Sequence, residues 1–238
     1  MIQMYTMIFW GKAREEDFDY TSKKIFDILQ CIVEGDIGID SFYLTASTKR
    51  NTSQLELNYN SITEILKKGV NKEGKTIMPE LGYSIGLFSS LDEEKSASIT
   101  ITVGITNPKF YNILIVQLPF SLQLMEDVLT MEKVSLLFKK VINTFDPFWA
   151  ALVNKPNTRR FDGHMNDHLP TAVHWLNYWG KDIVELVGVE SIENSPLYAK
   201  EKIKEGYFLK LKQTVIDDTC DQDIMLQREA NEYFKLLK

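Results

Sequence analysis

Two of the three histidines lie close together in a polar stretch of the chain. His164 and His168 are four positions apart, with Asp162 and Asp167 beside them. On a helix this spacing would place both imidazoles on one face, where they could bind a metal ion that activates water. A glycine and a proline flank the pair, however, and no HExxH pattern is present. A polar surface loop is therefore the simpler interpretation, and a metal-dependent hydrolase that uses the His164/His168 loop is kept as the alternative function.

The other reactive side chains do not form a recognisable catalytic set. Cys31 lies in an apolar helical pattern, and Cys220 is surrounded by aspartates whose negative charge makes it a poorer nucleophile. The sequence contains no GxSxG, P-loop or GxGxxG motif. No reaction is therefore legible from these residues, and we expect no catalytic residues, no metal and no cofactor.

The charge balance disfavours a nucleic-acid partner, and it suits either a basic partner or, more simply, solubility. The chain has 27 basic and 33 acidic residues, a net charge of −6, and a pI of about 5.2. Such a surface repels phosphate backbones, so we expect no direct nucleic-acid binding. No apolar run reaches the ~20 residues of a membrane span. The two cysteines are far apart and form no CxxC motif, which fits a reducing cytoplasm.

The N-terminal half predicts a strand, a helix and then a meander. Residues 2–10 are apolar enough for a central strand, and 15–34 have the spacing of an amphipathic helix that ends at Gly35. Ser98 to Val103 alternates strictly between polar and apolar residues, which predicts a strand with one buried face. Further predictions are a strand over 41–46, a helix from Asn60 or Ser61 to Lys68, a loop over 70–76, and meander strands over 82–89, 96–105 and 111–118.

The C-terminal half predicts elements around a polar stretch. Asp146-Pro147 would end a helix over 131–145. The remaining predictions are a strand over 148–153, a polar loop over 154–170, a strand-like or mixed segment over 171–178, a helix or turn over 181–187, a charged connection over 195–205, a strand over 206–213, and a closing helix over 220–237 with Ile224, Leu226, Ala230, Tyr233 and Leu237 as its apolar stripe. The chain thus reads as α+β, a mainly antiparallel sheet with several helices packed on it, in one domain over residues 1–238.

Aromatic residues are concentrated around the polar loop. The apolar neighbours of Trp10, Trp149 and Trp175 predict core positions for them. Tyr178 and Trp179 stand beside Gly180 and could be exposed anchors, since Tyr and Trp are enriched at interaction hot spots. A self-assembling or adaptor protein that uses these two residues is a third hypothesis, and it leaves a homodimer open.

Several of these segments, in order, resemble the immunity protein 52 family of bacterial polymorphic-toxin systems. Residues 145–150, FDPFWA, resemble the family's helix-ending FDPDWA element, and residues 175–178, WLNY, resemble its GWLTYL element. The chain departs from the family at His174, where glycine is usual, at Phe148, where an acid is usual, and at the added Trp179. The other similar segments are 9–15, 81–88, 98–104, 111–119, 206–211 and the closing helix.

The resemblance implies a non-enzymatic cytoplasmic α+β protein that binds and neutralises a cognate toxin. The family often accompanies restriction-endonuclease-fold nuclease toxins that a secretion system, such as type VI secretion, delivers between competing bacteria. A nuclease face tends to be basic, so the acidic surface fits this partner. Anchors within an acidic rim would give tight binding. The expected partner-binding residues are Asp92, Glu93 and Glu94 in a hairpin loop, and Arg160, Phe161, Asp162 and His164 in the polar loop.

Overall fold

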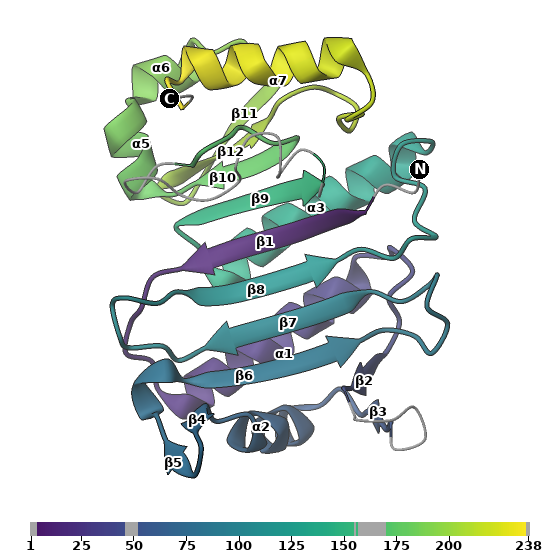
Figure 1. Ribbon diagram of the computed structural model, residues 1–238, viewed down its shortest axis with the longest axis vertical. Helices are drawn as coiled ribbons and strands as arrows, with labels where there is room; N and C mark the ends of the chain where they lie inside the picture. Colours follow the sequence, from purple (N-terminus) through teal and green to yellow (C-terminus); the bar gives the residue numbers. More distant parts are fainter. Residues whose placement is uncertain (1–3, 46–51, 155, 157–169, 237–238) are drawn as a thin grey trace.

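The fold is a large antiparallel sheet with helices on it, which confirms the predicted α+β class. The computed structural model describes residues 4–45, 52–154, 156 and 170–236. The described strands form a ten-stranded sheet in the order β11-β12-β10-β9-β1-β8-β7-β6-β2-β3 (Figure 1). All neighbouring pairs are antiparallel. The strands are β1 (Tyr5–Gly11), β2 (Phe42–Leu44), β3 (Gln54–Leu55), β6 (Tyr83–Phe88), β7 (Ser98–Val103), β8 (Asn112–Gln117), β9 (Trp149–Asn154), β10 (Leu176–Trp179), β11 (Ala199–Ile203) and β12 (Gly206–Lys210).

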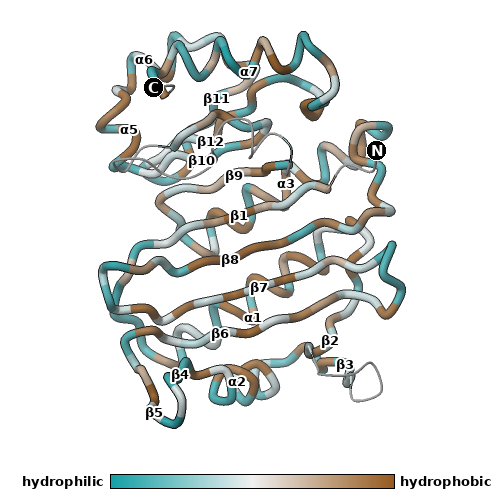
Figure 2. The backbone as a smooth tube through the Cα atoms, viewed as in Figure 1, coloured by the Kyte–Doolittle hydropathy of each residue, from teal (hydrophilic) through white to brown (hydrophobic). Residues whose placement is uncertain are grey.

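The predicted meander is confirmed as β6, β7 and β8, and the first strand is central as expected. β1 pairs with β8 on one side and with β9 on the other. Its residues alternate between buried and partly buried, and those of β7 alternate between exposed and buried over most of its length. Period-2 alternation of this kind places one set of side chains in the core. Figure 2 shows hydrophobic residues along the central strand β8.

Two long helices cover one face of the sheet. These are α1 (Phe18–Glu34) and α3 (Val128–Phe145), which lie behind the strands in Figure 1. Asp17 and Asp127 cap them by accepting hydrogen bonds from backbone N–H groups of the first turn. Phe9 of β1 packs on Phe138 of α3, with ring centroids 5.0 Å apart. The largest part of the apolar core therefore lies between these helices and the sheet.

The opposite face is covered near β10 by the C-terminal helix α7 (Asp221–Tyr233). Tyr178 pairs with Phe208, which packs toward α3, so Trp179 must point to the other face. Its indole lies edge-on to Phe234, just beyond α7, at 4.8 Å. On this face Trp10, Trp149 and Trp179 occupy one cross-strand row, and the rings of Trp10 and Trp149 are stacked at 3.9 Å.

The inward stripe of α7 differs from the predicted apolar one. The helix buries Asp223, Gln227, Ala230 and Asn231, whereas Tyr233 is exposed and Ile224 is only partly buried. The polar members face inward because they bond main-chain groups. Asn231 accepts from the Val173 N–H at 2.6 Å, and Gln227 donates to the Val173 carbonyl at 2.7 Å. Leu237 lies outside the described residues.

Three further local predictions need correction. The charged connection predicted over 195–205 contains β11, which pairs with β12. The helix α2 (Tyr59–Lys68) is capped by Asn58 and not by Asn60 or Ser61, and the Asn58 side chain accepts from the Ser61 N–H. The loop predicted over 70–76 contains β4 (Lys72–Glu73), which pairs with β5 (Thr76–Ile77). The remaining helices are η2 (Pro79–Leu81), α5 (Lys181–Val187) and α6 (Val189–Glu193).

The strand register defines two ends of the sheet. At one end lie the row of Trp10, Trp149 and Trp179 and the β7–β8 loop, because Trp10 also pairs with Ile113 at the start of β8. We call this the motif end, since residues 145–148 lead into it. At the other end β9 finishes at Asn154, and β6 leads into residues 91–95. We call this the acidic end.

Candidate functional site

Four segments that are distant in sequence converge at the motif end. They are the start of the β1–α1 loop, the β7–β8 loop, the turn from α3 to β9, and α5. Asn112 joins the first two. Its buried amide donates to the Lys12 carbonyl at 2.7 Å and accepts from the Ile105 N–H at 3.0 Å. One side chain thus satisfies a backbone group in each loop and holds the two loops together.

The turn from α3 to β9 is built by residues 145–148. Asp146 adopts a left-handed conformation (φ 59°, ψ 58°), and its N–H still bonds the Ile142 carbonyl. Aspartate tolerates this conformation better than most residues, and a left-handed residue is a common way to end a helix. Phe148 then donates to the Trp10 carbonyl at 2.9 Å and accepts from the Gly180 N–H at 2.8 Å. Its backbone is therefore held from both sides.

Gly180 is required by this close approach. A Cβ atom at this position would lie 2.8 Å from the Phe148 carbonyl oxygen and 3.0 Å from its Cα atom. Both neighbours are backbone atoms, so neither could move aside without shifting the turn. The end of β10 is thereby fixed against the turn that leads into β9.

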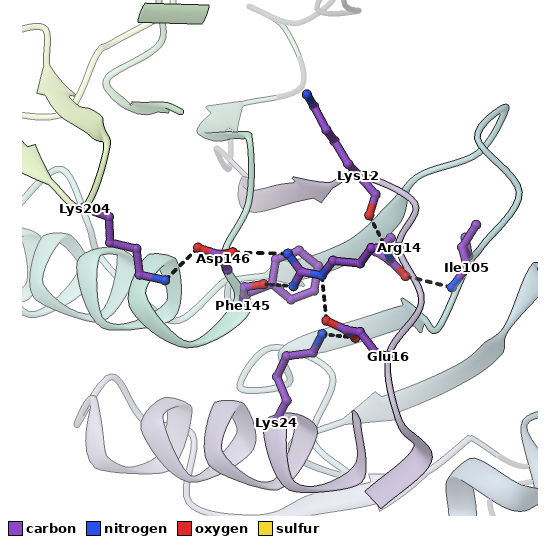
Figure 3. A network of polar contacts seen from close by, with 9 residues as sticks. Lys12, Arg14, Glu16, Lys24, Ile105, Phe145, Asp146 and Lys204 are labelled. Carbon is purple, nitrogen blue, oxygen red and sulfur yellow. Dashed lines mark hydrogen bonds and ion pairs between the residues drawn. The ribbon is translucent and has the colours of Figure 1, made fainter. Parts of the chain in front are cut away.

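An ionic network ties the turn to α1 (Figure 3). Arg14 donates to Glu16 at 2.6 Å, to Asp146 at 3.1 Å and to the Phe145 carbonyl at 3.3 Å. Lys24 of α1 forms an ion pair with the other oxygen of Glu16, and their side chains are 4% and 5% exposed. Lys204, from the β11–β12 turn, bonds Asp146 at 2.7 Å. The network connects four segments and leaves the Glu16–Lys24 pair out of water.

The protonation states in this network follow from burial and pairing. Burial alone would raise the pKa of Glu16, but the hydrogen bonds and charges of Lys24 and Arg14 outweigh it and lower that pKa. Burial lowers the pKa of Lys24, and the Glu16 carboxylate offsets part of the effect. Burial also acts to raise the pKa of Asp146, but the hydrogen bonds and charges of Lys204 and Arg14 outweigh burial and lower that pKa. The two acids are thus held ionised, as hydrogen-bond acceptors.

Beside the network lies a pocket of about 590 Å³, which we call the motif pocket. Its apolar walls come from Pro108 and Tyr111 of the β7–β8 loop, Phe148 of the turn, and Ile183 and Leu186 of α5. The rings of Tyr111 and Phe148 are 5.4 Å apart. The pocket is also lined by Ala13 and by three charged residues, Lys12, Asp182 and Glu185.

The rim of the motif pocket exposes large apolar side chains. Among the lining residues, Leu186 is 61% exposed and Tyr111 is 40% exposed, and Phe110 and Val189, which lie close to them in the sequence, are also exposed. Lys12 crosses the rim to form an ion pair with Asp182. A hollow with exposed aromatic and aliphatic side chains is typical of a surface that binds another molecule.

The structure places the predicted hairpin residues at the other end of the sheet. Asp92, Glu93 and Glu94 lie in the β6–β7 loop at the acidic end. Asp92 accepts from the Glu94 N–H and lies 3.7 Å from Lys95, and the Ser121 N–H bonds the Glu94 carbonyl. The hairpin is therefore an ordered turn that contacts the β8–α3 loop. The other predicted contacts, Arg160, Phe161, Asp162 and His164, lie outside the described residues.

Two alternatives from the sequence meet different outcomes. Tyr178 and Trp179 are buried, at 4% and 0% exposure, so the hypothesis that they are exposed anchors for self-assembly is wrong. The His164/His168 loop lies outside the described residues, and no group of three His, Cys, Asp or Glu elsewhere in the described chain could hold a metal ion. No helix within the described ranges is long and apolar enough to cross a membrane.

The sequence reasoning missed the motif pocket because its walls come from four distant segments. One signal was present in the sequence. Phe148 stands where the resembling family usually has an acid, and here it forms the pocket wall next to Tyr111.

Comparisons with known proteins agree with this fold. A sequence model of the family described as immunity protein 52 matches residues 3–191. Among solved structures, one titled Pseudomonas aeruginosa T6SS protein PA0821 has a TM-score of 0.63 and 12% identity, over 99% of this chain and 73% of that chain. At that identity the likeness shows the fold alone. No curated protein sequence matches the chain.

Proposed function

Because the chain belongs to the immunity protein 52 family, we propose that it binds a cognate bacterial toxin and neutralises it. The observation that carries this proposal is the family match over residues 3–191, which runs from β1 through α5 into α6. The match includes the whole motif pocket and the turn at residues 145–148. The proposal treats residues 1–238 as one immunity-protein domain, which the single large sheet from β11 to β3 supports.

The proposed toxin is a nuclease with a restriction-endonuclease fold that a secretion system delivers. The proposal places its binding by this chain in the cytoplasm. The net charge of −6 supports this partner, because a nuclease must present a basic face to phosphates. Asp92, Glu93 and Glu94 would attract that face as it approaches. Arg160, Phe161, Asp162 and His164 stay proposed contacts from the sequence.

The chemistry of the motif pocket supports binding over catalysis. Its described lining includes no histidine, cysteine or serine. Its one ion pair joins Lys12 to Asp182, so both charges already have a partner. A serine or cysteine nucleophile next to a histidine base, the commonest arrangement for covalent catalysis, is therefore not found in this lining.

The test of the proposed function is co-expression with the toxin encoded beside this chain's gene. The expected result is that cells survive only when the chain is present, and that the two proteins co-purify as a 1:1 complex. Cell death at equal expression, together with two separate peaks on size exclusion, would end the proposal. Purified complex should also lose the toxin's nuclease activity, which tests the proposed class of toxin separately.

Steering by the acidic hairpin has its own test. In the double variant Glu93→Lys/Glu94→Lys we expect the association rate with the toxin to fall by roughly tenfold at low salt. The difference should shrink as salt screens the charges. A matched variant on α7, Glu229→Lys/Glu232→Lys, changes the net charge equally at exposed positions. An equal fall of the association rate in both variants would mean that the net charge of the protein sets this rate, and that the position of the hairpin does not matter.

A further inference from the structure

We propose that the motif pocket receives an apolar side chain of the toxin that lies next to a basic residue. This inference rests on the proposed function and names the surface that carries it out. The occupant is a protein segment with an aromatic or leucine-like anchor, since the pocket walls are Pro108, Tyr111, Phe148, Ile183 and Leu186. Anchors of this kind, inserted in a pocket, supply most of the affinity in many interfaces.

The walls of the pocket are fixed before any partner arrives. The Phe148 backbone is bonded to β1 on one side and to the residue after β10 on the other. Asn112 holds the β7–β8 loop against the β1–α1 loop. Lys12 bridges from that loop to Asp182 of α5. A preformed site avoids the entropy of ordering loops, so more of the contact energy appears as affinity.

The rim offers apolar surface that the fold itself does not use. Phe110, Tyr111, Leu186 and Val189 are 49%, 40%, 61% and 52% exposed, and they come from the β7–β8 loop on one side and from α5 and α6 on the other. Exposed apolar side chains beside a hollow, such as Tyr111 and Leu186 here, favour a binding surface, whereas scattered exposed apolar residues do not. Burial of this rim would also exclude water around the anchor.

The charges at this end indicate the sign of the partner. Lys12 is paired with Asp182, and Lys181 at the start of α5 is paired with Glu205, whereas Glu185 and Glu190 are exposed and adjoin Leu186 and Val189 in the sequence. Lys109 is the cation of the β7–β8 loop on the opposite rim. The helical side of the pocket thus combines carboxylates with apolar groups. It fits a partner segment whose anchor adjoins a lysine or arginine, as expected for a nuclease face.

The motif pocket and the acidic hairpin lie at opposite ends of the same strands. The six residues of β7 or β8 span roughly 20 Å. A standard interface buries about 800 Å² per partner, which corresponds to a patch roughly 30 Å across. The strands between the two ends are therefore shorter than one such patch is wide, and the proposal assigns steering to the acidic end and anchoring to the motif end.

The test compares two exposed leucines on helices. Leu186→Glu puts a charge into the rim, and Leu136→Glu makes the same change on α3, where Leu136 is 53% exposed. With the toxin encoded beside this chain's gene as the probe, Leu186→Glu should weaken binding by roughly 30-fold or more, as expected for a hot-spot residue. The control should change it by less than about threefold, as other surface substitutions do. Glu185→Lys should weaken binding through charge, with Glu229→Lys as its control.

Hydrogen exchange of the full-length complex separates the possible failures. Protection of residues 108–111 and 183–189 on toxin binding supports the proposal. Protection confined to 91–95 and 120–129, or wild-type affinity in Leu186→Glu, overturns the pocket assignment while the proposed function stands. A wild-type chain that binds no toxin overturns both. Dimerisation lost in Leu186→Glu, without any effect on toxin binding, would show that a second copy covers the pocket, and would also overturn the proposal.

Discussion

Arg14 and Asp146 are 132 positions apart in the sequence and are joined by a hydrogen bond of 3.1 Å. The bond connects the loop after β1 to the left-handed residue that ends α3. Lys204 bonds the other carboxylate oxygen of Asp146. The residue that stops the helix is thus also the residue that links the two central strands to the β11–β12 turn.

Substitutions at Asp146 should separate backbone conformation from charge. Asp146→Gly removes the half-exposed ion pairs but accepts the left-handed conformation, and it should cost about 1 kcal/mol of unfolding free energy. Asp146→Ala adds roughly 1–2 kcal/mol of backbone strain. Urea denaturation of both variants measures the difference. Equal losses of unfolding free energy in Asp146→Ala and Asp146→Gly would show that the left-handed conformation of residue 146 causes no strain in alanine.

Removal of one partner from the buried Glu16–Lys24 pair should be strongly destabilising. Glu16→Gln leaves the Lys24 ammonium without its carboxylate, and we expect a loss of about 3 kcal/mol. The double variant Glu16→Gln/Lys24→Met should recover part of it, because the uncompensated charge is gone. Glu64→Gln is the control, since its pair with Lys67 is exposed. It should cost less than about 1 kcal/mol. A double variant as unstable as Glu16→Gln would contradict this account.

The same carboxylate should contribute to acid unfolding. The pKa of Glu16 is lowered in the folded protein, so its contribution to stability is complete above the ordinary pKa of about 4.3. The contribution is lost as the pH falls through the folded-state pKa. Stability curves below pH 4.5 should therefore be flatter for Glu16→Gln than for the wild type. Parallel curves would show that Glu16 keeps its ordinary pKa in the folded protein.

His174 should make the stability of the protein depend on pH in a range above the one in which Glu16 acts. The side chain is 2% exposed, its Nε2 atom has no partner among the described residues, and burial lowers its pKa from 6.5 to about 4. Between these values the unfolded chain binds a proton that the folded chain does not. Stability should thus fall by roughly 3 kcal/mol as the pH drops from 6.5 to 4, and level off below.

The measurement for His174 is the slope of unfolding free energy against pH. His174→Phe and His174→Leu should both lose the slope between pH 6.5 and 4, whatever their absolute stability. Two substitutions guard against a variant that does not fold. A slope that persists in both would assign the titration to another group.

The buried polar side chains of α7 should contribute as much to the stability of the fold as apolar side chains in the same place would. Asn231→Leu would leave the buried Val173 N–H without an acceptor, at a cost of about 1–3 kcal/mol. Gln227→Leu would do the same to the Val173 carbonyl. Because both bonds hold one residue, the double variant should cost less than the sum. Arg228→Ala, exposed on the same helix, is the control. Thermal unfolding that is unchanged in both leucine variants would contradict this role.

Local patterns were sufficient for much of the fold. The alternation in Ser98–Val103 predicted a strand with one buried face, and β7 has that form. Asp146-Pro147 predicted the end of a helix, and α3 ends at Phe145. These predictions hold because period-2 burial, helical burial and the restriction that proline imposes act within a few residues.

Much less of the candidate site than of the fold could be predicted from the sequence. Asp92, Glu93 and Glu94 form an exposed hairpin turn as expected, and their role in binding stays a prediction. The motif pocket joins Lys12, Tyr111 and Phe148 to α5. No local period relates these positions, because the antiparallel register brings them to one end of the sheet.

The sequence by itself determined the fold class, the meander, the two long helices and the resemblance to an immunity family. Only the tertiary structure decided that the charged segment Ala199–Ile203 is a strand and that α7 turns Gln227 and Asn231 inward. It also decided that Trp179 is buried and that a pocket opens beside Phe148. The physical reason is common to these cases. A charged strand is stabilised by the backbone partner beside it, and a buried amide by the N–H or carbonyl it bonds, and those partners come from elsewhere in the chain.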